Sequence, residues 1–270
     1  MLDVIAGARQ RLVLSLFRCN DTGVLGALDA ALKRGVKVEA ILTKRAKRGK
    51  KQLRQLWAAL ERMGAVVHRY SHSTVYHAKY LVADGQIAIV TTLNPTTKCF
   101  TRTWDMLLTT RERSVVRSLS TVFALDAAGK RVLPRHRISP RLIIGPESAR
   151  HRMQSLLASA RRSIHILDHK LSDPDLVSLL RERRDEGISV SVIGHQPMEK
   201  IVPHGKMIII DESLVALGST AMSALSLDSR RELSIVAAAP SVVRPLHEFY
   251  QSLAARAGRS VSRLPGDRAA

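Results

Sequence analysis

The sequence predicts an α/β protein built from two fused halves of similar design. Short apolar runs alternate with segments of helical spacing, which is the pattern of strands joined by helices. One segment occurs twice: residues 76–94 read YHAKYLVADGQIAIVTTLN and residues 203–221 read PHGKMIIIDESLVALGSTA. Matching residues lie 127 positions apart (204 − 77), so we expect two copies of one structural unit.

In the first half, turn and capping residues divide the chain into β-α-β units. Asn20, Asp21 and Thr22 offer an N-cap for a helix that ends at Gly35. Helices between consecutive strands make those strands parallel. The pattern predicts helices over residues 2–9, 22–34 and 53–60, and strands over 12–17, 36–42 and 65–70.

The second half repeats this order after the cap-and-proline pair Asp173 and Pro174 starts a helix that Gly187 ends. We expect strands over residues 142–145, 164–167, 188–193 and 231–237, and helices over 148–160, 174–186 and 242–254. The strand over 231–237 corresponds to one over 104–109 in the first half.

These elements predict the domain boundaries. The first half spans residues 1–126, a linker spans 127–140, the second half spans 141–256, and a basic tail expected to be disordered spans 257–270. The helix-ending glycines lie 152 apart (187 − 35), which is 25 more than the motif spacing. The first half therefore contains an insertion, which includes a cationic run over residues 43–51 that is either a solvated turn or a contact for an anion.

The charge balance favours an anionic partner. Lys and Arg outnumber Asp and Glu by 43 to 23, a formal charge of +20, which attracts nucleic acid or acidic lipid surfaces, although solubility alone is another explanation. Two cysteines are too few for a disulfide framework, and no apolar run approaches 18 residues. We expect a soluble, cytoplasmic protein that contacts a membrane at most peripherally. The oligomeric state and a start upstream of Met1 stay open.

The repeated motif places a histidine and a lysine two residues apart, His77 with Lys79 and His204 with Lys206. On a strand, such residues point to one face, so four basic groups converge if the two copies meet. A cluster of like charges is costly unless an anion binds there. Lysine beside each histidine opposes a bound cation, so we expect no metal and no cofactor.

Two histidines on one phosphate suit a division of labour, in which one attacks phosphorus and the other protonates the leaving oxygen. Each requires an acceptor for its other ring nitrogen, and Asp105 and Glu232 follow their own histidines by 28 residues (105 − 77 and 232 − 204). The remaining motif residues divide into two groups. Phosphate contacts are expected from Thr92, Asn94 and Ser219, and structural roles from Asp84, Asp211 and Gly218.

The pattern His-x-Lys, four residues, Asp, six residues, Gly-Ser-x-Asn resembles the signature of the phospholipase D superfamily over nearly the whole chain. The resemblance implies an α-β-α sandwich in each half and one active site on a pseudo-twofold axis. It also implies a metal-independent phosphodiesterase with a phosphohistidine intermediate. By this likeness His77 is the nucleophile, paired with Glu232, and His204 is the general acid, paired with Asp105 of the opposite half.

Two departures from the signature stand out. Thr91 and Thr92 replace Gly-Ser in the first copy, and Ala221 replaces Asn in the second, which removes a donor worth about 1.5–3 kcal/mol if its hydrogen bond is charge-assisted.

Three functions remain open. The first is hydrolysis or transphosphatidylation of a phospholipid, the second is a nuclease, and the third is a catalytically impaired anion-binding module. Aromatic residues make up 4% of the chain, which offers little for base stacking.

Overall fold

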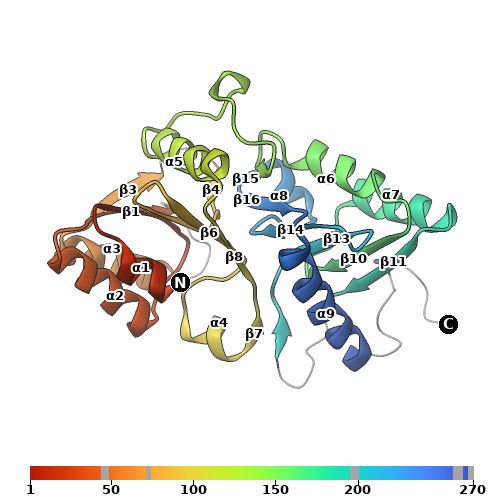
Figure 1. Ribbon diagram of the computed structural model, residues 1–270, viewed down its shortest axis with the longest axis horizontal. Helices are drawn as coiled ribbons and strands as arrows, with labels where there is room; N and C mark the ends of the chain where they lie inside the picture. Colours follow the sequence, from red (N-terminus) through yellow and green to blue (C-terminus); the bar gives the residue numbers. More distant parts are fainter. Residues whose placement is uncertain (44–48, 71–73, 195–200, 258–263, 267–270) are drawn as a thin grey trace.

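Two six-stranded sheets stand side by side in this computed structural model, which describes residues 1–43, 49–70, 74–194, 201–257 and 264–266 (Figure 1). The strand order is β3-β2-β1-β5-β6-β8 in the first sheet and β11-β10-β13-β14-β16-β9 in the second. In each sheet, the parallel strands pair with an antiparallel hairpin, and this hairpin directly follows the His-x-Lys residues of the repeated segment. The predicted fold class, two fused halves of mixed α/β structure, is confirmed.

The first half contains most of its helices before the motif. Its elements are α1 (Leu2–Gly7), β1 (Arg11–Leu16), α2 (Thr22–Lys33), β2 (Lys37–Thr43), α3 (Lys50–Met63), β3 (Val66–Tyr70), β4 (Val75–Tyr76), β5 (Tyr80–Ala83), β6 (Ile87–Thr91), α4 (Thr97–Thr101), β7 (Thr103–Trp104), β8 (Leu107–Thr110) and α5 (Arg113–Ala127). As expected, Asp21 caps α2 by accepting a hydrogen bond from the Val24 N–H.

The second half follows a short 3-10 turn, η1 (Pro134–His136), in the expected linker. Its elements are β9 (Leu142–Ile144), α6 (Ala149–Ala158), β10 (Ser163–Leu167), α7 (Pro174–Asp185), β11 (Ser189–Ile193), β12 (Val202–Pro203), β13 (Met207–Ile210), β14 (Leu214–Gly218), α8 (Ala224–Asp228), β15 (Arg230–Arg231), β16 (Leu233–Ala237) and α9 (Pro240–Ala257). Asp173 caps α7, with Pro174 in its first turn.

Three apolar clusters form the core, and one of them joins the two halves. One cluster lines the inner faces of both sheets and includes Leu119 of α5, Leu217 of β14 and Tyr250 of α9. The outer face of the first sheet packs against α1, α2 and α3, and that of the second against α6, α7 and α8 (Figure 1). Because the central cluster takes side chains from both halves, burial of apolar surface opposes their separation.

Two short parallel strand pairs cross between the halves. In one, β4 of the first half pairs with β15 of the second, and in the other, β12 of the second half pairs with β7 of the first. The expected continuous strands over 104–109 and 231–237 are therefore interrupted. Asp105 and Glu232 each lie at the break, because the chain passes there from a crossing pair into its own sheet.

The sequence-based prediction missed three helices and was wrong about part of the tail. Helix α5 buries Val115, Leu119 and Val122 at helical spacing, a signal that was present in the sequence, whereas α4 and α8 have only five residues each. In the tail, Leu264 is 3% exposed and packs against the outer cluster of the second half, since burial of this apolar side chain favours an ordered position. Most of the cationic run, residues 44–48, lies outside the described residues.

Arg231 connects the halves electrostatically. Its side chain is 1% exposed and forms ion pairs with Asp126 of α5 at 3.0 Å and with Glu147 at 2.6 Å. Burial raises the pKa of Asp126 to about 7, with Glu147 adding to the rise and the Arg231 charge opposing it. Removal of the guanidinium therefore leaves two carboxylates close together without their counter-charge.

We expect Arg231→Leu to lower the free energy of unfolding by about 3–5 kcal/mol, because it leaves buried charge uncompensated. Urea denaturation followed by circular dichroism measures this loss. The matched control is Arg141→Leu, which removes an ion pair with Glu112 that is about half exposed and is expected to cost about 0–1 kcal/mol. Equal losses in the two variants would contradict the connecting role of Arg231.

Candidate active site at the junction of the halves

His77 is positioned by the first crossing pair. It directly follows β4, and its main-chain N–H donates to the carbonyl oxygen of Arg231 at 2.9 Å. This places its Nδ1 2.9 Å from Oε2 of Glu232, whose side chain is 1% exposed. With Nδ1–H donating to this carboxylate, the lone pair of His77 lies on Nε2.

His204 is positioned in the same way by the second crossing pair. It follows β12, and the N–H of Gly205 donates to the carbonyl oxygen of Trp104 at 2.8 Å. Nδ1 of His204 lies 2.9 Å from Oδ1 of Asp105. Each histidine is thus hydrogen bonded to the acid that comes from the opposite half.

The two lysines lie beneath their histidines. The expectation that each His-x-Lys lies within a strand was wrong, because His77 and Lys79 fall in the break between β4 and β5, and His204 and Lys206 in the break between β12 and β13. The backbone there leaves a crossing pair and joins a main sheet. Lys79 Nζ still lies 3.2 Å from Nε2 of His77 and donates to the His77 carbonyl oxygen at 2.7 Å, and Lys206 donates to that of His204 at 2.9 Å.

Burial and like charge lower the pKa values of His77, Lys79 and His204. Burial lowers the pKa of His77 to about 3, and the charges of Lys79 and Lys206 add to this effect while Glu232 opposes it. Burial and the charge of Lys206 likewise lower the pKa of Lys79 to about 7. Burial also lowers the pKa of His204; the hydrogen bond and charge of Asp105 oppose this effect, and the charges of Lys206 and Lys79 add to it. The empty site therefore favours neutral imidazoles.

The two acids remain ionised. Burial by itself raises the pKa of Glu232, but the charges of His77 and Lys79, with hydrogen bonds from His77 and Ser219, hold it well below its usual value. For Asp105, hydrogen bonds from His204, Thr103 and Thr92 likewise outweigh burial and lower the pKa. Both carboxylates can thus orient a neutral histidine and stabilise a protonated one.

The hydroxyl groups of Thr92 and Ser219, which were expected to contact the phosphate, form hydrogen bonds within the protein. Both are fully buried, and their hydroxyl groups are used inside the protein instead of facing a substrate. Thr92 donates to Asp105 at 2.6 Å, and Ser219 exchanges hydrogen bonds with the main chain of Leu233. Thr92 directly follows β6, which pairs with β8, and Ser219 directly follows β14, which pairs with β16, so each lies beside the strand that follows its acid.

Asn94 and Ala221 occupy the same place in the two copies. Asn94 is 9% exposed and lines the cavity beside His204, and its Oδ1 is buried without a hydrogen-bond partner among the described residues. Ala221 offers only its main-chain N–H, which donates to Ser226 Oγ at 2.9 Å. Ser226 donates in turn to Glu232 at 2.9 Å, so this position supports the acid of His77.

The motif aspartates and Gly218 hold the scaffold. Asp84 accepts main-chain hydrogen bonds from Arg9, Gln10 and Arg11, at the start of β1. Asp211 accepts the equivalent bonds at the start of β10. A Cβ atom on Gly218 would lie 2.3 Å from the carbonyl oxygen of Leu233, so a side chain is excluded there.

Two ring contacts at the site were missed from the sequence. The Phe17 ring lies 4.9 Å from the His77 ring, and the His169 ring lies 5.4 Å from the His204 ring. Phe17 and His169 are 152 positions apart (169 − 17), which is also the spacing of the helix-ending glycines Gly35 and Gly187. Alignment of the two halves with this spacing would have paired Phe17 with His169. The next residues, Arg18 and Lys170, bring two further cations to the same region.

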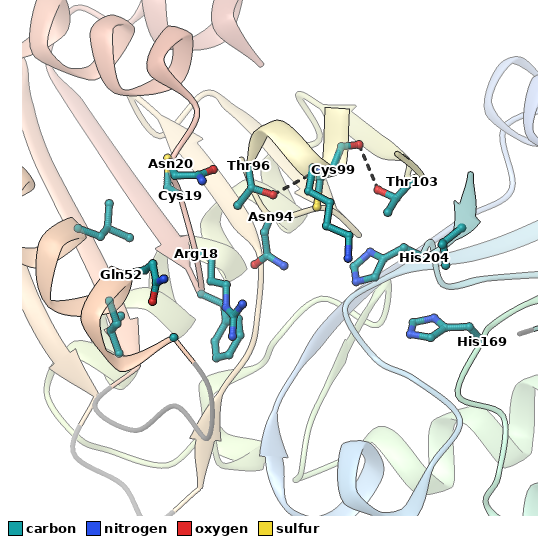
Figure 2. Close-up of a pocket in the computed structure, with 16 residues that line it drawn as sticks. Arg18, Cys19, Asn20, Gln52, Asn94, Thr96, Cys99, Thr103, His169 and His204 are labelled. Atoms are coloured by element: carbon teal, nitrogen blue, oxygen red, sulfur yellow. Dashed lines mark hydrogen bonds between the residues drawn. The ribbon is translucent and has the colours of Figure 1, made fainter. Parts of the chain in front are cut away.

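A cavity of about 610 Å³ opens beside His204 and extends over the first half toward α3. Figure 2 shows Arg18 and Asn94 of the first half facing His169 and His204 of the second around it. Its lining combines polar and apolar groups, including Phe17, Arg18, Leu53, Lys98 and Val202. The cavity can therefore hold a group that is partly apolar and partly anionic.

One group near the cavity has metal-ligand chemistry. Cys99, Asp105 and His204 place ligand atoms within 4.8 Å of one another. Binding a cation there would compete with the Asp105–His204 hydrogen bond and with the positive charges of Lys79 and Lys206, which both act on His204. The surroundings therefore favour an anion over a cation.

Comparison with known proteins identifies related folds. Residues 1–126 match the family described as "Cardiolipin synthase, PLD-like domain". The chain is similar to a polyphosphate kinase from Porphyromonas gingivalis, with a TM-score of 0.73 and 17% identity over 93% of this chain and 47% of that one. The chain thus spans about half the length of that enzyme. No curated protein matches it.

Two more solved structures are similar. Phosphatidylserine synthase from Haemophilus influenzae Rd KW20 has a TM-score of 0.70 and 11% identity, over 93% of this chain and 82% of that one. A phospholipase D family member, Nuc from Salmonella typhimurium, matches with a TM-score of 0.45 and 18% identity, over 48% of this chain and 86% of that one.

We expect anion binding to be coupled to proton uptake. A bound anion favours the charged forms of Lys79 and His204, so their lowered pKa values rise. Lys79, whose pKa is about 7, then takes up as much as about one proton per anion just above neutral pH, whereas His204 takes up protons at lower pH. Isothermal titration of sulfate, which stays fully ionised, in two buffers of different ionisation enthalpy measures this uptake. The variant Lys79→Met should reduce it, and identical heats in both buffers would contradict the prediction.

Proposed function

We propose that this chain, a phospholipase D-like protein by its family match and its fold, cleaves phosphodiesters through a phosphohistidine. The observation that carries the proposal is the pair of histidines, each hydrogen bonded through Nδ1 to a buried carboxylate of the opposite half. In this proposal, one phosphate binds between the two Nε2 atoms, neither of which is hydrogen bonded to an acid. The family match and the fold support phosphoryl-transfer chemistry in general. The individual steps and the substrate are proposed from the geometry of the site.

In the first step, His77 is the nucleophile. Its Nε2 lone pair attacks phosphorus, and the bond from phosphorus to the leaving oxygen breaks. His204, protonated through Nε2 when the phosphate binds, gives that proton to the leaving alkoxide. Glu232 stabilises the positive charge that develops on His77.

In the second step, His204 reverses its role. Now neutral, its Nε2 takes a proton from water, or from an acceptor alcohol in a transfer reaction, and the oxygen attacks the phosphohistidine. The bond between His77 Nε2 and phosphorus breaks, which restores the starting site. Lys79, Lys206 and Asn94 offer donors to the non-bridging oxygens and offset the charge of the transition state.

We propose a phospholipid as the substrate. The cavity beside His204 combines apolar residues with Arg18 and Lys98, as an anionic amphiphile requires. Lys98 of α4 lines the cavity, and Phe100 of the same short helix is 49% exposed outside it, so α4 carries both a positive charge and an exposed aromatic ring.

A nuclease is the alternative function. The polar groups of the same cavity, together with the charge of +20, are compatible with a nucleic-acid backbone. The third possibility, a binding module without turnover, rests on the missing amide at Ala221.

For the histidines, we expect His77→Asn to lower turnover at least about a thousandfold, because the nucleophile is absent. We expect His204→Asn to accumulate a phosphorylated protein, because the general base for the second step is absent. Mass spectrometry of peptides from a substrate-quenched sample locates the phosphate. His151→Asn, an exposed histidine of α6, is the control and should behave as the unaltered protein. Phosphate found on His204 in the His77→Asn variant would reverse the two roles.

For the substrate, incubation in EDTA with phosphatidylcholine, cardiolipin, plasmid and single-stranded DNA separates the three functions. We expect release of a lipid head group and intact DNA. Nicked DNA with intact lipid would establish the nuclease, and binding without turnover would establish the third possibility.

Phe100→Ser should lower turnover on vesicles but not on a short-chain soluble lipid. The control Leu107→Ser, which alters another exposed apolar residue, should lower neither.

A further inference from the structure

A second cluster of titratable groups lies in the second half, beneath α9 and apart from the residues of the active site. His165 belongs to β10, His247 to α9, and Glu212 to the turn between β13 and β14. One potential ligand atom from each of these residues lies within 4.8 Å of the other two. Three separate elements thus direct metal-ligand side chains to one point.

His165 is held in one orientation. Its Nδ1 lies 2.7 Å from Ser191 Oγ on the neighbouring strand, and Ser191 Oγ lies 2.9 Å from the hydroxyl of Tyr250. With Nδ1–H donating to Ser191, the lone pair is on Nε2. This atom is buried and has no hydrogen-bond partner within the part of the chain that the structure describes. A histidine that binds a metal has this arrangement, with one ring nitrogen hydrogen bonded and the other left for the ion.

The spacing of the other two groups suits an ion between them. His247 Nδ1 lies 3.8 Å from Glu212 Oε2, which is too long for a hydrogen bond. Two ligand atoms of tetrahedral zinc are about 3.3 Å apart, because each lies about 2.0–2.1 Å from the metal. The His165 and His247 rings are stacked, with centroids 5.2 Å apart and planes 24° apart, so the His247 ring has to turn about its side-chain bonds before one nitrogen of each ring and the Glu212 carboxylate point at one ion.

We propose that His165, His247 and Glu212 bind a zinc ion, with water in the fourth position, and that the ion ties α9 to the second sheet. Two imidazole nitrogens and one carboxylate oxygen are a donor set that zinc accepts. The site is independent of the proposed phosphodiesterase activity.

The test uses the full chain with Cys99→Ser, which removes one ligand of the Cys99, Asp105 and His204 group and so prevents confusion with it. Titration calorimetry with Zn²⁺ should show one ion bound per chain. Zn²⁺ should also raise the midpoint of thermal unfolding, because the ion binds the folded state. Co²⁺ should give the visible absorption of a tetrahedral site.

Three variants in this background decide the assignment. His247→Gln and Glu212→Gln should each raise the Kd for Zn²⁺ at least about tenfold and abolish the rise in unfolding temperature. The Glu212 side chain is 57% exposed, so Glu212→Gln should fold; the His247 side chain is 13% exposed, so circular dichroism is used to check the fold of His247→Gln. The control is His151→Gln, which removes an exposed histidine of α6 and should leave the Kd unchanged. Absence of saturable Zn²⁺ binding, or a loss smaller than tenfold in both variants, would overturn the site.

Discussion

The pairing of short strands across the two halves is the interaction on which the rest of this structure depends. Each crossing pair ends where a histidine and an acid begin: β4 and β15 lead into His77 and Glu232, and β12 and β7 lead into His204 and Asp105. Main-chain hydrogen bonds fix the register of these pairs. The geometry of each His–acid pair is therefore set by the backbone, and neither half can complete its own pair alone.

The electrostatics of the site follow from that constraint. Joining the halves buries two lysines and two histidines beside two carboxylates, and burial outweighs attraction for His77, Lys79 and His204, so the pKa values of these three groups fall. Such a site is costly when empty and becomes favourable when an anion enters. The structure tolerates this cost because the central apolar cluster and the buried Arg231 ion pairs join the halves independently of the site.

The two halves have diverged in ways that make the histidines unequal. His204 borders the large cavity, whereas His77 packs against Phe17 and has a side chain that is 12% exposed, compared with 24% for His204. Asn94 lines the cavity in the first copy, and its counterpart Ala221 supports Glu232 through Ser226. The divided roles proposed for the two histidines agree with this unequal access.

The sequence by itself determined the two-copy α/β design, the capped helices and the motif residues, because periodicity, caps and a constant spacing of 127 are local or repeated signals. The resemblance to the phospholipase D superfamily also rested on those residues. Only the tertiary structure decided that Thr92 and Ser219 face the acids, that Phe17 and His169 pack on the histidines, and that His165, His247 and Glu212 meet. These contacts join residues far apart in the chain, so they depend on how sheets and helices pack, a geometry that no local pattern of residues specifies.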